Sequence, residues 1–383
     1  MRRVYIVLST AGVGGAEKRF TDNWYSLVDK GMDIHLVMDR QTYQGLCEQT
    51  EYAQKLAPSN YLHVRDLGAG HFRLYCRAVH EFFSTQPKNS IVHFPLAYVP
   101  GIKLIYGHRL VMSWVNSAMP PFKKSQWRNG LGAWLGFMAA DYIDILNPNN
   151  LNKIRNFPRM ASKCGLTAGG TQVDAKQYYP LKKSLSFVFL GRLEPEKQSL
   201  RFLKVLPAVH QSLKAQGYHD YRFFICGDGK EASVIKALLE TTEFNDVPVE
   251  YGYSSRPNEI LGHASIYFSL QKTSNYPSKA LAEAMACGAL PILTNVGESS
   301  LMVDGLDYFN FVPKDFTAQD LLQPLSSFLA LSEIEKNNIV KNISAYAERR
   351  FRMGKQAEYF AEIYRLLDQE KYEFSKELRA PSL

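Results

Sequence analysis

The chain has 383 residues, more than the roughly 250 to 300 at which one hydrophobic core stops growing, so its length predicts two domains with a ligand site in the cleft between them. Its 46% hydrophobic and 21% charged residues exclude a disordered chain. The net charge of +8 favours anionic partners, namely phosphates, nucleotides, nucleic acid or an anionic membrane face.

The sequence lacks the patterns typical of secreted, membrane-spanning, nucleic-acid-binding, disulfide-bonded and zinc-binding proteins. The first apolar run is too short for a secretory signal, and no segment reaches the roughly 18 apolar residues of a membrane span, which predicts a cytoplasmic chain, peripheral on the membrane face at most. The basic residues are dispersed without interleaved aromatic residues, so we expect no nucleic acid. The chain has five scattered cysteines and no CxxC pair, which argues against a disulfide framework and a zinc site. The cysteines are Cys47, Cys76, Cys164, Cys226 and Cys287.

The first half of the chain alternates short β-branched or aromatic runs with longer stretches of helical periodicity, which predicts a doubly wound parallel α/β domain. A Gly, Thr and Pro-rich loop over 168–180 follows, and then the same alternation begins again. We expect strands at Val4–Ser9, Ile34–Met38, Tyr61–Val64, Ile91–Phe94, Leu110–Trp114 and Tyr142–Leu146, and at Phe187–Leu190, Phe223–Cys226, Pro248–Tyr251, Ile266–Leu270, Pro291–Thr294 and Phe309–Val312. The domain boundaries predicted from this pattern are 1–180 and 181–344, with C-terminal helices over 345–383 completing the first domain.

Two segments of the first domain allow more than one interpretation. Gly130–Ala140 pairs Trp134 with Phe137 but is short, so we interpret it as a buried helix rather than a membrane segment. The cations just before it either meet anionic head groups or belong to a solvated loop: Lys123, Lys124 and Arg128.

Four segments carry residue types suited to phosphate binding. The first is the glycine-rich turn Ala11–Arg19 after the first strand, which leads into a helix whose free N–H groups attract anions, although its spacing does not fit a dinucleotide fingerprint. The second is Gly191–Lys197, where Arg192 can fork onto phosphate oxygens and Lys197 supplies a point charge. The third is the turn Gly227–Gly229. Each of these three is also compatible with ordinary turn chemistry, and for Gly227–Gly229 that is the favoured interpretation.

The fourth segment, Ser274–Pro291, is the most informative. A polar loop containing Pro leads into a helix that holds Glu283 among small apolar residues and ends at Gly288. A carboxylate is costly to bury without a partner, so Glu283 binds either a ribose diol or a structural donor.

Taken in order, GGAEK, GRLEPEK, GDG and YPSKALAEAMACGALPILT resemble the retaining glycosyltransferases of family 4, also called glycosyl transferases group 1. The resemblance implies the GT-B fold, in which two Rossmann-like domains face each other across a cleft. It implies that Arg192 and Lys197 grip the donor diphosphate as catalytic cations, that Glu283 binds the ribose, and that Gly14 and Gly15 face the phosphates and the acceptor. The other implied nucleotide-sugar contacts are Gly227, Asn275, Tyr276, Pro277, Ser278 and Lys279.

Two departures from the family pattern bear on activity. Asn275 stands where the family usually has a glutamate, eight positions before the ribose carboxylate, and the family's histidine after the fifth strand is absent. Asn116 could take over part of that polar role, and His93 at the end of the fourth strand is a second catalytic candidate, against a packing role. His108, beside the fifth strand, has the same two interpretations.

The resemblance implies transfer of a sugar from a nucleotide-sugar donor, a UDP-sugar before a GDP- or dTDP-sugar, to a glycan or lipid-linked acceptor. It also implies bacterial surface polysaccharide or lipopolysaccharide biosynthesis, with no metal and no cofactor. Two alternatives remain open: a GT-B sugar-nucleotide epimerase and a non-catalytic nucleotide-sugar-binding protein.

Overall fold

The computed structural model describes residues 1–9, 13–68, 70–115, 134–154, 156–254 and 256–369. The chain divides into two compact units. Unit 1 comprises Met1–Gly170 and the chain from Gly354 onward, and unit 2 comprises Thr171–Met353. The observed boundaries thus lie at 170/171 and 353/354. The sequence pattern instead predicts boundaries at 180/181 and 344/345.

Unit 1 is built on a seven-stranded sheet in the order β3-β2-β1-β4-β5-β6-β7, and every pair of neighbouring strands is parallel. Its strands are β1 Val4–Leu8, β2 Ile34–Asp39, β3 Leu62–Arg65, β4 Ile91–Phe94, β5 Arg109–Trp114, β6 Tyr142–Ile145 and β7 Cys164–Leu166. Its named helices are α1 Gly15–Asp29, α2 Arg40–Cys47, α3 Thr50–Lys55, α4 Phe72–Ser84, α5 Ile102–Tyr106, α7 Pro148–Ile154, α8 Pro158–Ala161 and α15 Lys355–Asp368. Residues 134–139 are also helical. Leu135 and Met138 in this helix are exposed, so the interpretation of Gly130–Ala140 as a wholly buried helix is wrong for them.

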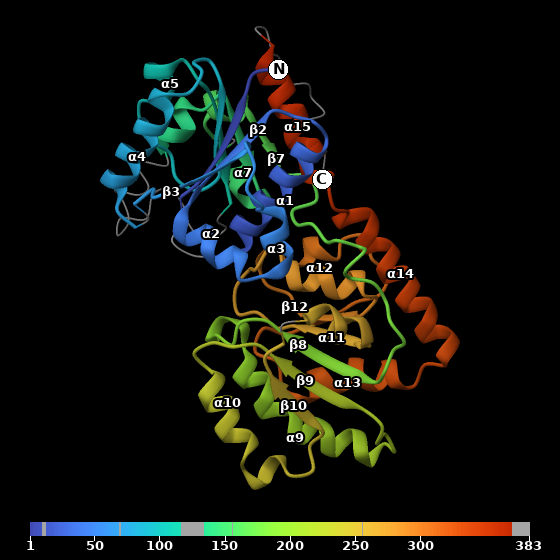
Figure 1. Ribbon diagram of the computed structural model, residues 1–383. Coiled ribbons are helices and arrows are strands. Elements are labelled where there is room, and N and C mark those ends of the chain that lie inside the picture. The colour runs from blue at the N-terminus through green and yellow to red at the C-terminus, as the bar shows by residue number, and fades with distance from the viewer. Residues whose placement is uncertain (10–12, 69, 116–133, 155, 255, 370–383) are drawn as a thin grey trace. The chain divides into compact units, whose positions relative to one another are not determined.

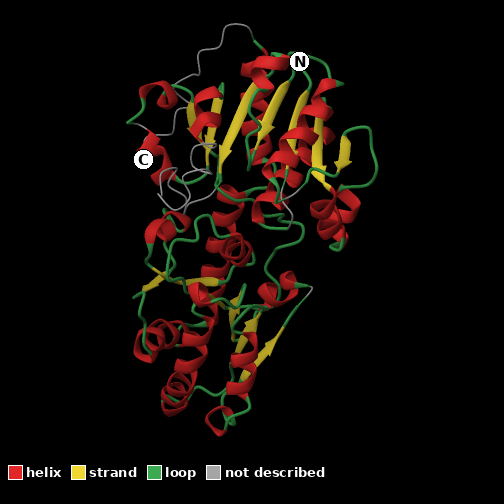
Figure 2. Cartoon of the chain, turned by 90° about the vertical axis from the view of Figure 1, so that its left-hand side faces the viewer, coloured by secondary structure: helices red, strands yellow, loops and turns green. Residues whose placement is uncertain are grey.

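Helices cover both faces of this sheet because its central strands are apolar on both sides. In β1, Val4, Ile6 and Leu8 pack with α1 and α15, whereas Tyr5 and Val7 pack with α4. Figure 1 shows α4 and α5 on one side of the sheet and α1 and α15 on the other, and Figure 2 shows the strands as a layer between helices.

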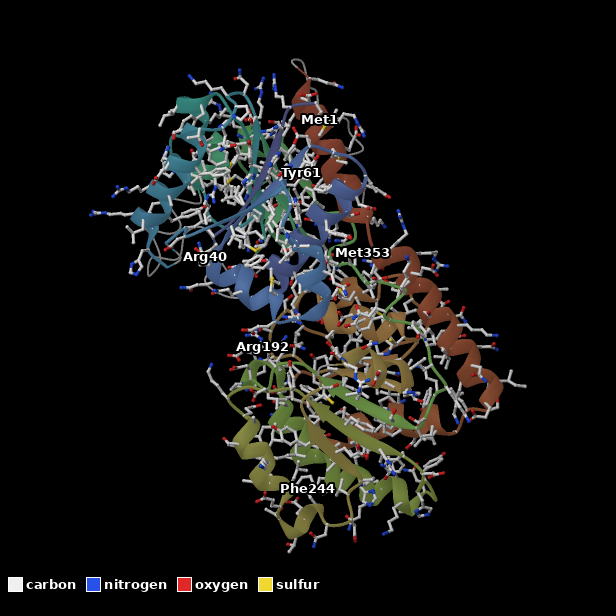
Figure 3. All side chains as sticks on the ribbon, viewed as in Figure 1. Met1, Arg40, Tyr61, Arg192, Phe244 and Met353 are labelled. Carbon is white, nitrogen blue, oxygen red and sulfur yellow. The ribbon has the colours of Figure 1, made fainter. Side chains whose placement is uncertain are left out.

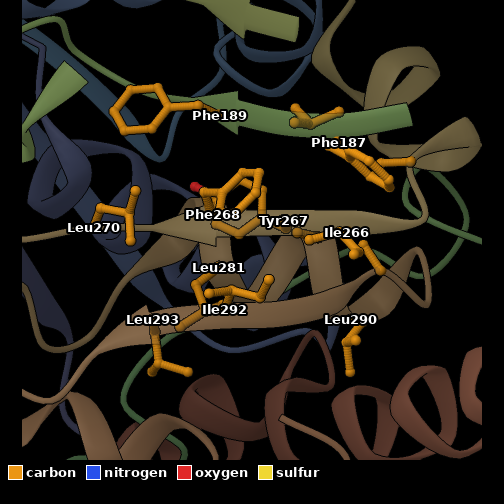
Figure 4. Close-up of a cluster of buried hydrophobic side chains, with 14 of the residues drawn as sticks. Phe187, Phe189, Ile266, Tyr267, Phe268, Leu270, Leu281, Leu290, Ile292 and Leu293 are labelled. Atoms are coloured by element: carbon orange, nitrogen blue, oxygen red, sulfur yellow. The ribbon is translucent and has the colours of Figure 1, made fainter. Parts of the chain in front are cut away.

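Unit 2 has a six-stranded sheet in the order β10-β9-β8-β11-β12-β13, also parallel throughout. Its strands are β8 Ser186–Leu190, β9 Arg222–Cys226, β10 Val249–Gly252, β11 Ile266–Ser269, β12 Leu290–Thr294 and β13 Asn310–Val312. Its helices are α9 Ser199–Ala215, α10 Ala232–Leu239, α11 Pro257–His263, α12 Lys279–Ala286, α13 Ala318–Leu329 and α14 Glu333–Phe351, with 3-10 turns η2 Pro195–Lys197, η3 Thr242–Phe244 and η4 Gly297–Met302. Figure 4 shows the apolar side chains of β8, β11 and β12 that form the middle of its core.

The two C-terminal helices belong to different units. Ile339, Ile343 and Tyr346 of α14 are buried in the core of unit 2, whereas Phe360 and Tyr364 of α15 are buried in unit 1. The chain changes units at Gly354, whose φ of +87° favours glycine. The predicted boundary at residue 345 therefore falls inside a continuous helix that stays with unit 2. Within the described residues, no helix is both long and apolar enough to cross a membrane.

Candidate nucleotide-sugar site

The order of strands in unit 2 creates a natural ligand position. From β8 the chain continues to β9 and β10 on one side of the sheet, whereas β11, which pairs with β8, is followed by β12 and β13 on the other. In doubly wound sheets, ligands bind at the carboxyl ends of the two strands where this direction changes. The segments that follow β8 and β11 are Gly191–Lys197 and Ser274–Glu283, two of the four predicted from sequence.

The segment after β8 presents two cations. Arg192 is exposed, and Lys197 closes the short turn η2, where its backbone N–H donates to the Glu194 carbonyl at 2.8 Å. Burial, followed by the nearby charge of Arg192, lowers the pKa of Lys197 to about 8, with Glu196 acting in the opposite direction. In the figure with all side chains, Arg192 and Phe244 lie at opposite ends of unit 2 (Figure 3). A positive end of the sheet with a partly desolvated ammonium suits a diphosphate.

The segment after β11 is joined to the first one. The Lys272 N–H donates to the Glu196 carbonyl at 2.8 Å, and the Ser278 hydroxyl accepts from the Leu281 N–H at 3.4 Å as the N-cap of α12. Glu283 lies one turn into this helix, only 8% exposed, with its Oε1 3.9 Å from Lys279 Nζ. Asn275, Tyr276 and Pro277 are partly exposed in the loop between, and the Tyr276–Pro277 peptide bond is cis.

The turn Gly227–Gly229 after β9 packs against the backbone of the segment Gly191–Lys197. A Cβ at Gly227 would lie 1.9 Å from the Gly191 carbonyl oxygen, and its φ of +151° also favours glycine. Gly227 is therefore required by backbone packing, and its contact with a nucleotide stays a prediction. Gly191 itself has neither a crowded Cβ position nor a positive φ.

Two acidic residues at this edge were missed by sequence reasoning. The Ser274 hydroxyl donates to Glu298 Oε2, which brings a carboxylate from η4 beside the loop that holds Asn275. Glu231 accepts from the Ser199 hydroxyl and from the Leu200 N–H at 3.2 Å, and so caps α9. Neither residue belongs to a recognisable motif, because both contacts depend on tertiary structure.

In unit 1 the glycine-rich turn leads into α1 as predicted. Glu17 Oε2 accepts the Gly14 N–H at 2.8 Å, so a carboxylate already satisfies one free donor of this helix end. Among the described residues, nothing lies within 4 Å of the position that a Cβ would take at Gly15, whose φ is ordinary, so their packing does not require a glycine there.

His93 lies inside unit 1 with no exposed surface. Its Nδ1 is 2.7 Å from the Tyr364 hydroxyl and its Nε2 is 2.8 Å from Ser113 Oγ, which donates to Asp144 Oδ2 at 2.6 Å. Because Ser113 gives its one proton to Asp144, His93 donates through Nε2 and accepts from Tyr364 through Nδ1. Burial, reinforced by the charge of Arg19, lowers the pKa of His93 to about 3, so the ring is neutral.

Asp144 is the acidic group at the centre of this buried network, and its pKa is raised overall. Burial raises its pKa, while Arg19 and the hydroxyl groups of Ser113, Thr167 and Tyr359 lower it. Arg19 is only 8% exposed, and none of its three guanidinium nitrogens has a hydrogen-bond partner among the described residues. Asp144 thus lies within electrostatic reach of the buried Arg19 guanidinium, and each group favours the charged form of the other.

His108 likewise has a packing role, since its ring is buried and its Nδ1 accepts the Ser90 N–H at 3.1 Å. Of the other predicted groups, Asn116 and the loop cations Lys123, Lys124 and Arg128 lie outside the described residues. In the described part of the chain, no cluster of three His, Cys, Asp or Glu side chains could hold a metal ion.

Comparison with known proteins gives one family match and many structural ones. Residues 172–349, nearly the whole of unit 2, match the family model of glycosyl transferases group 1. No curated protein sequence matches the chain. The Anabaena protein Alr3699/HepE, solved in complex with UDP and glucose, has a TM-score of 0.70 at 14% identity, over 95% of this chain and 99% of its own.

Two further solved structures are similar over almost the whole chain. A glycosyltransferase from Rickettsia africae ESF-5 has a TM-score of 0.69 at 14% identity, over 97% of this chain and 100% of its own. The lipopolysaccharide outer core galactosyltransferase WaaB in its apo form has a TM-score of 0.63 at 14% identity, over 94% and 98%. The fold of two parallel-sheet α/β domains is therefore GT-B, as the sequence predicts.

Proposed function

We propose, from a C-terminal unit that matches the family model of glycosyl transferases group 1 and a chain with the GT-B fold, that this protein transfers a sugar from a nucleotide-sugar donor to a glycan or lipid-linked acceptor. The proposed transfer retains the anomeric configuration and needs no metal. A UDP-sugar is the preferred donor, ahead of a GDP- or dTDP-sugar, because structural neighbours bind UDP or UDP-glucose. The proposed setting is bacterial surface polysaccharide or lipopolysaccharide assembly at the cytoplasmic membrane face.

The observation that carries this proposal is the pairing of β8 with β11. It brings Arg192, Lys197 and the capped end of α12 to one edge of one sheet, at the strand pair where the chain direction changes. Cations and helix N–H groups stabilise the negative charge that develops on a leaving diphosphate, and they act without reorganisation when they are already in place. Glu283, one turn into α12, is the proposed acceptor for the two ribose hydroxyl groups.

The proposed transfer needs no catalytic group beyond those that bind the diphosphate. The acceptor oxygen forms a bond to the anomeric carbon on the face from which the diphosphate leaves, and the acceptor proton passes to a phosphate oxygen. No side-chain base is needed, which agrees with the neutral, fully buried His93. Catalysis then depends on positioning and on charge stabilisation.

The second candidate is a non-catalytic nucleotide-sugar-binding protein, and Asn275 is the observation that favours it. An amide at this position cannot supply the negative charge that the family pattern places there. This candidate predicts nucleotide binding without transfer or slow hydrolysis of the donor.

The test is the thermal unfolding of the protein with UDP, GDP, dTDP, ADP or CMP. A ligand at about a hundred times its dissociation constant stabilises a protein by about 2.7 kcal/mol, which a melting curve detects easily. We expect UDP to raise the transition temperature most, and Arg192→Ala and Glu283→Ala to remove the effect. Nuclear magnetic resonance of a UDP-sugar then follows the anomeric proton in the presence of saccharide acceptors.

Each outcome separates the candidates. An axial anomeric product from an axial donor supports retaining transfer, conversion of the donor to an epimer without acceptor supports an epimerase, and binding with an unchanged donor supports the non-catalytic protein. If no nucleotide stabilises the chain at millimolar concentration, the proposed function is wrong.

A further inference from the structure

The segment after β12 brings a carboxylate to the edge of the sheet that carries the proposed donor site. β12 pairs with β11 in parallel, and β11 in turn pairs with β8, whose following turn holds Arg192. The ends of β11 and β12 are joined, because Thr294 Oγ1 accepts the Gln271 N–H and donates to the Gln271 carbonyl, both at 2.8 Å. The turn η4 comes shortly after β12, and Glu298 is its second residue. Arg192 and Glu298 therefore follow the two strands that flank β11.

Glu298 is in direct contact with the loop that follows β11. The Ser274 hydroxyl donates to Glu298 Oε2, and it accepts the N–H groups of Glu298 and Tyr276, each at 3.4 Å. A Cβ at Gly297 would lie 2.6 Å from Ser274 Cβ, and the φ of +52° there also favours glycine. Gly297 therefore lets η4 approach the loop more closely than a residue with a side chain would.

The other side of η4 is anchored to α14. Arg350 Nη2 donates to the Leu301 carbonyl at 2.6 Å, and the Tyr346 hydroxyl donates to the Met302 carbonyl at 3.0 Å. Tyr346 is itself buried in the core of unit 2. Because η4 is fixed on both sides, Glu298 meets a ligand with little reorganisation, which favours affinity.

The loop after β11 has no acidic side chain of its own. Between Gln271 and Ser278 the sequence contains neither Asp nor Glu, and the partly exposed Asn275 offers an amide. Glu283, one turn into α12, is already the proposed acceptor for the ribose. The partly buried Glu298 therefore supplies this loop with a carboxylate from a separate segment.

An amide and a carboxylate suit the hydroxyl groups of a sugar ring. A carboxylate accepts hydrogen bonds from two neighbouring hydroxyl groups, and such charge-assisted bonds are stronger than neutral ones. The amide of Asn275 both donates and accepts. A diphosphate instead requires cations, which Arg192 and Lys197 supply after β8.

We propose that Glu298 binds hydroxyl groups of the transferred sugar and so supplies the negative charge that the family pattern has at position 275. The inference rests on the proposed function and deepens it, because it assigns the class of sugar. That class is a neutral hexose with neighbouring free hydroxyl groups, as against a sugar acid, whose own carboxylate Glu298 repels. Asn275, the observation that favours the non-catalytic candidate, is then compensated by a carboxylate on the neighbouring segment.

The experiment is calorimetric titration of the full chain and its Glu298→Gln variant with UDP, UDP-glucose, UDP-galactose, UDP-N-acetylglucosamine and UDP-glucuronate. We expect the variant to bind UDP as the wild type does. It should bind the tightest of the neutral UDP-sugars about tenfold more weakly, as for a lost hydrogen bond to a charged group. Its affinity for UDP-glucuronate should rise about threefold, because a like charge is removed.

Two further variants separate sugar binding from support of the loop. The double variant Asn275→Glu/Glu298→Gln moves the carboxylate to the loop and should recover most of the lost UDP-sugar affinity. Ser274→Ala removes the hydrogen bond to Glu298 but keeps its charge, so it should lower UDP-sugar affinity less than Glu298→Gln does. The matched control is Glu333→Gln, because the Glu333 side chain is 82% exposed at the start of α14, and it should bind every ligand as the wild type does.

The outcomes distinguish this inference from the proposed function. If the wild type binds UDP and Glu298→Gln keeps its affinity for the UDP-sugars, the inference is overturned and the proposed function stands. Equal losses in Ser274→Ala and Glu298→Gln, without recovery in the double variant, would also overturn it, because Glu298 would then only support the loop. Absence of UDP binding by the wild type would contradict the proposed function and the inference together. Melting curves of all variants verify that they are folded.

Discussion

The two units share one architecture but finish the carboxyl ends of their central strands differently. In unit 2, the turn after β8 presents an exposed Arg192 and a partly buried Lys197. In unit 1, β4, β5 and β6 hold His93, Ser113 and Asp144, linked to one another and to α15 by hydrogen bonds. The same edge of a doubly wound sheet is thus open and positive in one unit and closed by a buried polar network in the other.

Residue type alone does not identify a functional group in this fold. Arg19 and Arg192 both follow a glycine-containing turn after a strand, yet Arg19 is buried within electrostatic reach of Asp144 and Arg192 is exposed. A charge inside the fold serves stability, and its loss should cost stability first. Loss of a charge at the carboxyl edge of the sheet in unit 2 should lower ligand affinity and leave the fold intact.

The largest effect should come from Asp144→Ala. Removing the carboxylate leaves the buried Ser113 and Thr167 hydroxyl groups without their acceptor and takes away the acidic group that acts on Arg19, which together should cost about 3 to 5 kcal/mol of unfolding free energy. Urea unfolding measures it, and UDP affinity of the folded variant should be unchanged. Asp220→Ala, an exposed aspartate before β9, is the control and should stay within about 0.5 kcal/mol. A loss below about 1 kcal/mol for Asp144→Ala would show that the network does not stabilise Arg19.

The second largest effect should come from Gly227→Ala, because Gly227 packs against the turn that holds Arg192. The added Cβ would meet the Gly191 carbonyl oxygen at 1.9 Å, so the turn before Arg192 must move. We expect about 2 to 4 kcal/mol of lost stability together with weaker UDP binding. Gly252→Ala is the matched control, since no described residue lies within 4 Å of its Cβ position. If Gly227→Ala and Gly252→Ala bind UDP with equal affinity, the turn at Gly227 does not contribute to the nucleotide site.

Asn275→Ala should have a smaller and more selective effect. If Asn275 contacts the sugar, the variant should bind the UDP-sugar several-fold more weakly and bind UDP as the wild type does, since a hydrogen bond contributes about 1 kcal/mol. Calorimetric titration with both ligands makes the comparison. Unchanged UDP-sugar affinity and turnover would remove Asn275 from the sugar site.

The smallest effect is a dependence of UDP affinity on pH. The pKa of Lys197 is lowered to about 8, and a diphosphate binds the ammonium form, so affinity should fall as pH rises through about 8. Lys197→Arg keeps its charge and should flatten this profile between about pH 7 and 9. A wild-type profile as flat as that of the arginine variant would exclude Lys197 from the diphosphate contact.

The sequence predicted most of the fold because the strands are apolar runs of ordinary length. All twelve predicted strands occur with their ends shifted by at most two residues, whereas β7, Cys164–Leu166, was missed because three residues give no periodicity. The positive segments could be found because Gly, Arg, Pro and Lys cluster within a few positions. The network of Arg19, His93 and Asp144 could not, although the aspartate inside the apolar strand Tyr142–Ile145 was a signal for a buried charge.

Diphosphate binding at the carboxyl edge of the sheet in unit 2 is the property on which the proposed function most directly depends. Calorimetric titration of UDP into the wild type, Arg192→Ala and Arg222→Ala tests it, because Arg222 is an exposed arginine at the opposite, amino end of the same sheet. We predict that Arg192→Ala lowers UDP affinity by about ten- to a hundredfold, as expected for a lost charge-assisted contact, while Arg222→Ala leaves it unchanged. Equal affinities for the two variants would contradict the account.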